Sequence, residues 1–183
     1  MNRGVLLLRG GELIDVDGRR TGDLRVPGPS EQTRELDVTG KLVIPGLIDM
    51  HAHVFAGQDL GVDPDVVGPQ TGTTTFIDTG TAGAHTFGAF RRGTIDRAIP
   101  RIRAFLNIST IGITSMLLAG EAENLAYCDV DACVGAAREH ADLILGVKVR
   151  ASANVVGANG DEPLRRAREA ADKLGLPLMV HIG

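Results

Sequence analysis

The segment that most constrains this chain is Lys41–Phe55, which reads KLVIPGLIDMHAHVF. It begins as an apolar run, is interrupted by Pro45 and Gly46, and places His51 and His53 two residues apart near its end. Side chains alternate between the two faces of a β-strand, so both imidazoles are expected to point to the same side. Two neutral imidazoles at a strand end form half of a site for zinc or a similar divalent ion, although the same spacing also occurs on exposed strands that bind no metal.

The chain divides into two regions with different sequence patterns. Residues 1–45 are expected to form a small β-domain of short strands joined by turns. Residues 46–183 alternate apolar runs with helical patterns, which predicts a parallel sheet of βα units. Strands are predicted near residues 43–51, 73–78, 102–108, 143–149 and 177–182, and helices near 62–70, 85–99, 130–141 and 163–174. This spacing is typical of a (β/α) barrel, in which chemistry lies at the C-terminal ends of the strands.

The motif PGLIDMHAH resembles the first-strand signature of the amidohydrolase superfamily of metal-dependent hydrolases. The resemblance continues in FIDTGTAGAHTF at residues 76–87, FLNIS at 105–109, GVKVRAS at 146–152 and LPLMVHIG at 176–183. Together these segments resemble the amidohydrolase/deacetylase branch, close to the dihydroorotase-like enzymes, and they extend over nearly the whole chain. The resemblance implies an α/β fold, a (β/α)8 TIM barrel preceded by half of a small β-sandwich.

Two further polar side chains are expected at strand ends. In LILGVKV at residues 143–149, alternation directs the odd-numbered positions toward the helices, and Ile144 and Lys148 toward the barrel interior. By the same alternation, His181 faces inward at the end of the last predicted strand. Lys148 could instead extend out of the barrel or pair with Asp78. His181 could instead be a core histidine whose hydrogen bonds are satisfied.

The resemblance assigns roles to these four residues. His51 and His53 would bind a first divalent metal ion, expected to be zinc. Lys148 would bridge to a second ion as a carbamate, formed when its amine adds carbon dioxide, and His181 would bind that second ion. A carbamate suits this position because burial and neighbouring metal ions both oppose a lysine cation. The resemblance also implies a metal-activated hydroxide that attacks an amide or ester carbonyl.

Other polar residues receive weaker interpretations. Asp49 shares the inward face of its strand and is interpreted as a buried structural carboxylate. Asn107 and Ser109 end the third predicted barrel strand, where they could meet substrate. His85 and His140 fall in predicted helices and are expected to pack or to face solvent.

The sequence ends at Gly183, two residues after His181. The resembled family needs another histidine from strand six and a catalytic aspartate from strand eight, so no catalytic residue of that kind is expected within the chain. A complete barrel takes about 250 residues. We therefore expect a form truncated or split after strand five, with activity only if a second copy or a complementing chain closes the barrel.

Composition limits the partners. With 19 Lys and Arg against 23 Asp and Glu, the net charge is −4, and the chain has no Trp and one Tyr. This balance gives no reason to expect nucleic acid or an acidic membrane as a partner. Two sparse cysteines, no signal-like N-terminus and no sufficiently long apolar run indicate a soluble, cytoplasmic protein.

The sequence leaves three functions open: a metallohydrolase, an inactive fragment of one, or a binding and assembly module. For a hydrolase, the resemblance implies a small-molecule substrate. Its class remains open between N-acetyl or O-acetyl groups, as in deacetylases, and a cyclic amide, as in dihydroorotase-like enzymes.

Overall fold

The computed structural model describes residues 4–118 and 120–182, and the chain divides into two units, Met1–Gly46 and Leu47–Gly183. The first unit is a sheet of β1 (Gly4–Asp15), β2 (Gly18–Val26), β3 (Ser30–Asp37) and β4 (Leu42–Val43). β1 pairs antiparallel with β2 and parallel with β3 and β4. The β1–β2 hairpin turns at Val16 and Asp17, and Gly18, the first residue of β2, has a φ of 111°.

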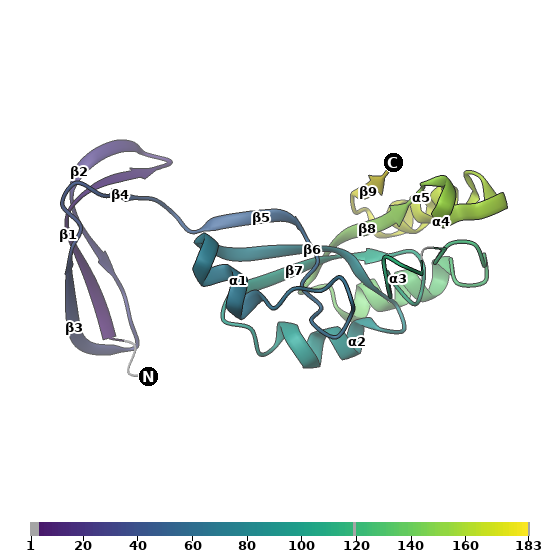
Figure 1. The fold of residues 1–183 in the computed structure, drawn as a ribbon, viewed down its shortest axis with the longest axis horizontal. Helices are drawn as coiled ribbons and strands as arrows, with labels where there is room; N and C mark the ends of the chain where they lie inside the picture. The colour runs from purple at the N-terminus through teal and green to yellow at the C-terminus, as the bar shows by residue number, and fades with distance from the viewer. Residues whose placement is uncertain (1–3, 119, 183) are drawn as a thin grey trace. The chain divides into compact units, whose positions relative to one another are not determined.

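The second unit contains one parallel sheet in the order β5-β6-β7-β8-β9 (Figure 1). Its strands are β5 (Leu47–Ala52), β6 (Thr73–Gly83), β7 (Arg101–Asn107), β8 (Ile144–Arg150) and β9 (Leu178–His181). Consecutive strands pair in parallel, and helical segments follow β5 to β8, which is the arrangement of successive barrel units. The structure confirms the predicted α/β class and the partial barrel.

The strand predicted at residues 43–51 is two strands. β4 pairs with β1 in the first unit, whereas β5 pairs with β6 in the second. Pro45 and Gly46 lie between them, outside both strands. Proline cannot donate a ladder hydrogen bond, so it separates the two pairings.

Helices cover one face of the parallel sheet (Figure 1). They are α1 (Pro64–Thr71), α2 (Phe87–Phe90), the π-helical η1 (Arg91–Ile95), α3 (Val130–Glu139), α4 (Ala153–Val156), the 3-10 turn η2 (Gly157–Asn159) and α5 (Glu162–Leu174). α1 and α2 pack on β6, α3 on β7, and α5 on β8 and β9. Asp63 and Asp129 cap α1 and α3 by accepting backbone N–H groups of the first turn. In the part of the chain described, no helix is long and apolar enough to cross a membrane.

The helix predicted at residues 85–99 is shorter than expected, because only α2 and η1 form there. The helices predicted near residues 62–70, 130–141 and 163–174 are confirmed as α1, α3 and α5. α4 and η2 were not predicted from the sequence. Each has no more than four residues, too few for a periodic apolar pattern.

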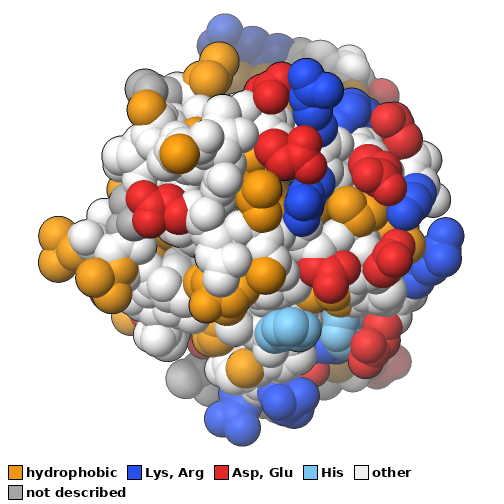
Figure 2. Space-filling view, turned by 90° about the vertical axis from the view of Figure 1, so that its right-hand side faces the viewer, with side chains coloured by type: hydrophobic (Ala, Val, Ile, Leu, Met, Phe, Trp, Pro, Cys, Tyr) orange, Lys and Arg blue, Asp and Glu red, His pale blue; other side chains and the backbone are white. Residues whose placement is uncertain are grey.

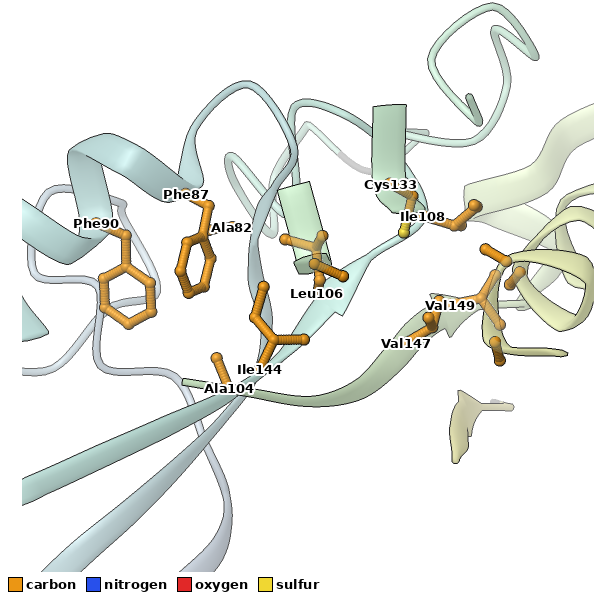
Figure 3. Packing of buried hydrophobic residues seen from close by; sticks show 14 of the residues in the cluster. Ala82, Phe87, Phe90, Ala104, Leu106, Ile108, Cys133, Ile144, Val147 and Val149 are labelled. Atoms are coloured by element: carbon orange, nitrogen blue, oxygen red, sulfur yellow. The ribbon is translucent and has the colours of Figure 1, made fainter. Parts of the chain in front are cut away.

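The hydrophobic core lies between the sheet and these helices (Figure 3). Phe87 and Phe90 from α2 are fully buried in the same cluster as Leu106 of β7 and Val147 of β8. Burying apolar side chains stabilises a fold by about 25 cal/mol per Å² of surface removed from water. The core therefore fixes the strands whose ends carry the polar residues described below.

Ile144 belongs to this core and does not face the barrel interior, so that prediction is wrong (Figure 3). The pairing register shifts between β7 and β8: Ala104 lies opposite Ile144, and Phe105 opposite Gly146. Leu145 is therefore an extra residue, and it is 39% exposed. Such a bulge reverses the alternation on one side of it, while Lys148 keeps the predicted inward direction.

The bulge can be tested by truncating the two neighbouring side chains. Ile144→Ala should lower the free energy of unfolding by about 2–5 kcal/mol, because it empties a core position. Leu145→Ala should lower it by less than about 1 kcal/mol, because that side chain is already partly in water. Urea unfolding of both variants measures the difference, and equal losses would contradict the bulge.

Candidate active site

His51 and His53 lie at the end of β5 on the same side, as predicted. Their ring centroids are 5.9 Å apart with an interplanar angle of 67°. The register shifts between Asp49 and Ala52, and the His51 N–H donates to Asp49 Oδ1 at 3.0 Å within this bulge. Asp49 itself is exposed, so its interpretation as a buried carboxylate is wrong. It supports the local backbone that presents His51.

Lys148 is the most unusual side chain of this region. It is 1% exposed, and its Nζ has no hydrogen-bond partner among the residues that the structure describes. Extension into solvent and pairing with Asp78 are therefore both wrong. Burial, and secondarily the nearby charge of Arg150, lower the pKa of the Lys148 amine. Both effects favour the neutral amine over the ammonium ion.

Gly80 provides the space in which the Lys148 stem lies. A Cβ at Gly80 would come within 2.6 Å of Lys148 Cγ and 2.8 Å of its Cβ. Gly80 also has a φ of 89°, a conformation that other residues rarely adopt. The Asn107 amide donates to the Gly80 carbonyl at 3.1 Å and holds this close approach in place.

Asp78 and Thr81, at the end of β6, lie behind His53. Thr81 Oγ1 is 2.7 Å from His53 Nδ1 and donates to Asp78 Oδ2 at 2.8 Å. Asp78 also accepts the backbone N–H groups of Val54 and Thr81, both at 2.9 Å. Burial raises the pKa of Asp78 to about 6, although these hydrogen bonds act in the opposite direction. Asp78 is therefore mostly ionised at neutral pH and serves as a buried acceptor.

A buried ion pair adjoins the site. Arg150, two residues after Lys148, donates from Nε and an Nη atom to both carboxylate oxygens of Glu121, at 2.7 and 2.8 Å. Both side chains are less than 10% exposed. This bidentate pair ties the loop after β7 to the end of β8. The sequence analysis did not single out either residue, because they are 29 positions apart.

His181 ends β9 and lies opposite Arg150 in the register. It is exposed, so the alternative of a satisfied core histidine is wrong. Burial lowers the pKa values of His51 and His53, and Lys148 and His181 are among the smaller causes for both rings, which indicates that the four side chains share one region. Figure 2 shows the end of the molecule toward which the strands run, with exposed His side chains in pale blue.

Burial is the main cause of the lowered pKa values at His51 and His53, and it brings the pKa of His53 to about 4. Both rings are therefore neutral at neutral pH. A neutral imidazole has one nitrogen with a free lone pair, which is the form that binds metal. The two rings are thus in the state that a ligand role requires.

The remaining polar residues of the sequence analysis have structural contacts. Asn107 and Ser109 are buried, and the Asn107 carboxamide oxygen accepts the Ser109 N–H. Ser109 Oγ donates to the Glu121 carbonyl. These hydrogen bonds engage the side chains of Asn107 and Ser109, so neither is available to a substrate. His140 packs on Phe87 and contacts Arg91, outside the site. His85 is exposed in the turn before α2.

The side chains of the site supply few ligands for a metal ion in their unmodified form. Within residues 4–118 and 120–182, no group of three or more His, Cys, Asp and Glu side chains is arranged to hold one. Catalytic zinc generally has three protein ligands. His51 and His53 supply two, and the buried, unpartnered Lys148 could supply an oxygen ligand only after modification. If Lys148 is modified in this way, the residues of the site fit a metal ion.

The fit of Gly80 against Lys148 gives a test of this geometry. Gly80→Ala should cost about 1–2 kcal/mol for the positive φ, plus about 1–3 kcal/mol for the contact with the lysine stem. Gly72→Ala is the matched control, because Gly72 has a φ of 74° and no atom within 4 Å of an added Cβ. Urea unfolding should show the larger loss for Gly80→Ala. The same loss for both variants would mean that Gly80 is not closely packed on Lys148.

Comparison with known proteins places the chain in a family. The model of the amidohydrolase family matches residues 42–183. Deacetylase Atu3266 of Agrobacterium fabrum is 34% identical over 152 residues, which are 82% of this chain and 37% of that protein. A deacetylase of Brucella anthropi is 34% identical over 172 residues, 93% of this chain and 43% of its own length. The chain thus spans about two fifths of the length of these relatives.

Two solved structures resemble the fold closely. A dihydroorotase superposes with a TM-score of 0.87 at 28% identity, covering 99% of this chain and 52% of that one. An adenine deaminase superposes with a TM-score of 0.80 at 31% identity, covering 97% and 50%. These similarities extend over both the sheet and the strand ends described above. The chain belongs to the amidohydrolase family.

Proposed function

We propose that this chain carries the metal-binding part of a hydrolase that cleaves an amide or ester bond of a small molecule. The observation that supports it most is the Lys148 amine, buried without a partner beside His51 and His53 at the ends of parallel strands. Family membership supports hydrolysis, and the similarity to deacetylases favours an enzyme over a binding module.

Lys148 would act as a carbamate. Its neutral amine nitrogen forms a bond to the carbon of carbon dioxide and releases one proton to solvent, which leaves an N-carboxylate. The lowered pKa of the amine supports this step, because only the unprotonated nitrogen has a lone pair to react. The product replaces an unpaired donor with an anion that can accept bonds from two sides.

The proposed ligand set has two parts. His51 and His53, with one carbamate oxygen, would hold a first divalent ion. The other carbamate oxygen and His181 would contribute to a second. Imidazole nitrogen with oxygen is a donor set that suits zinc. When bound, such ions supply Lewis acidity, which polarises a substrate carbonyl and makes water more acidic.

The other residues of the site would orient this set. The Glu121 carboxylate holds Arg150 through two bonds, so the guanidinium charge is compensated and does not need to pair with the carbamate. Gly80 keeps the lysine stem in its groove. The exposed faces of His51 and His181 leave the site open to a substrate.

Deacetylation is the preferred reaction. Two relatives at 34% identity are named deacetylases, so an N-acetyl or O-acetyl compound is the proposed substrate class. A cyclic amide is the second candidate, because a dihydroorotase superposes over 99% of the chain.

Metal analysis tests the ligand set. After incubation with zinc and bicarbonate and removal of free metal, His51→Ala and His53→Ala should each weaken zinc binding by more than the roughly 10- to 100-fold that loss of a supporting group costs. His85→Ala is the matched control, because His85 is an exposed histidine outside the site. Unchanged zinc content in both site variants would remove the proposed function.

The substrate class can be tested in the same preparations. Zinc-loaded protein should release acetate from acetylated amines or alcohols faster than it opens a cyclic amide, with His53→Ala as the blank. Faster opening of the cyclic amide would replace deacetylation with the second candidate.

A further inference from the structure

We infer that Thr81 and Asp78 are positioning residues that fix the tautomer and the orientation of His53, so that its Nε2 lone pair is offered to a metal ion. This inference rests on the proposed function for the metal, but the tautomer is a property of the metal-free protein. Neither residue was a candidate ligand, and neither is exposed to substrate, since both are 0% exposed.

The direction of the hydrogen bonds follows from proton counting. Thr81 Oγ1 lies between Asp78 Oδ2 at 2.8 Å and His53 Nδ1 at 2.7 Å, and a hydroxyl has one proton to donate. Both Asp78 oxygens accept backbone N–H groups, so the carboxylate acts as an acceptor and the Thr81 proton points to it. The Thr81 oxygen is then an acceptor, and His53 Nδ1 must carry the proton that it accepts. In a neutral imidazole with its proton on Nδ1, Nε2 is the nitrogen with the free lone pair.

Asp78 is held as an acceptor by groups that cannot reverse their direction. The backbone N–H of Thr81 donates to Oδ1 and that of Val54 to Oδ2, both at 2.9 Å. Val54 follows His53 directly, so one carboxylate holds the backbone next to His53 and, through Thr81, its ring. This two-point attachment orients the imidazole as well as its proton.

The same segment of β6 also contacts Lys148, another proposed ligand. Gly80, which precedes Thr81, packs on the stem of Lys148. Residues 78–81 therefore contact His53 through Thr81 and Lys148 through Gly80. Supporting groups of this kind usually set the tautomer of a metal-binding histidine, and their loss costs about 10- to 100-fold in metal affinity.

Three variants separate this role from a general effect on packing. Thr81→Val keeps the shape and removes the hydroxyl, whereas Thr81→Ser keeps the hydroxyl. Thr79→Val is the matched control, because Thr79 is an equally buried threonine of the same strand whose hydroxyl donates to the Ala52 backbone carbonyl at 3.4 Å rather than to the His53 ring.

The first measurement is long-range ¹H–¹⁵N NMR of the histidine side chains in metal-free protein at pH 8. Wild type, Thr81→Ser and Thr79→Val should show His53 with its proton on Nδ1. Thr81→Val should shift His53 toward the Nε2–H form, which free imidazole side chains favour in water, while the exposed His51 stays unchanged. A wild-type His53 with its proton on Nε2 would overturn the inference without any variant.

The second measurement is titration with zinc alone in bicarbonate buffer. Thr81→Val should bind zinc about 10- to 100-fold more weakly than wild type, whereas Thr81→Ser and Thr79→Val should stay close to wild type. Unchanged affinity and tautomer in a folded Thr81→Val would overturn the inference. A wild type that has the Nδ1–H form but binds no zinc would instead overturn the proposed function and leave the tautomer assignment supported.

Discussion

The burial of the Lys148 amine without a hydrogen-bond partner is the constraint on which the site depends. An unpaired charge taken out of water costs several kcal/mol, against a total stability of about 5–15 kcal/mol for a domain. This cost favours a neutral or chemically modified amine, and its surroundings agree. Burial lowers its pKa, and Glu121 compensates the charge of Arg150, the cation two residues further along β8. As an ammonium ion, Lys148 would only weaken the fold. Its burial is explained if the neutral or modified amine has a chemical role.

The segment of β6 at residues 78–81 connects this lysine to the histidines on the opposite side of β6. It is built from a buried carboxylate, a glycine with positive φ and a threonine, and none of these is a metal ligand by itself. Each contacts another part of the sheet or the segment that follows it: Asp78 the backbone after β5, Gly80 the lysine of β8, and Thr81 the ring of His53. Strand ends in a parallel sheet are brought together by the fold, but side-chain orientation needs such local supports.

The approximate positions of the parallel strands and the inward direction of Lys148 could be predicted from the sequence, because both depend on local periodicity. The bulge at Leu145 could not, because it depends on which residue of β7 lies opposite. For the same reason Ile144 was predicted on the wrong face. Asp49 was predicted as buried because it shares a face with His51, yet its strand pairs only with β6 in the part of the chain described. The contacts of Thr81 with Asp78 and His53 bring together residues up to 28 positions apart, which no motif indicated.

The most direct test of this account is ¹³C NMR of the protein after equilibration with ¹³C-labelled bicarbonate and zinc. The account predicts a carbamate carbon resonance in the wild type that is absent from Lys148→Met and retained in Lys173→Met, where an exposed lysine of α5 is replaced. Methionine keeps much of the length of the buried stem, so the fold should tolerate the change. A well-folded, zinc-loaded wild type without this resonance, or with the same resonance in Lys148→Met, would contradict the account.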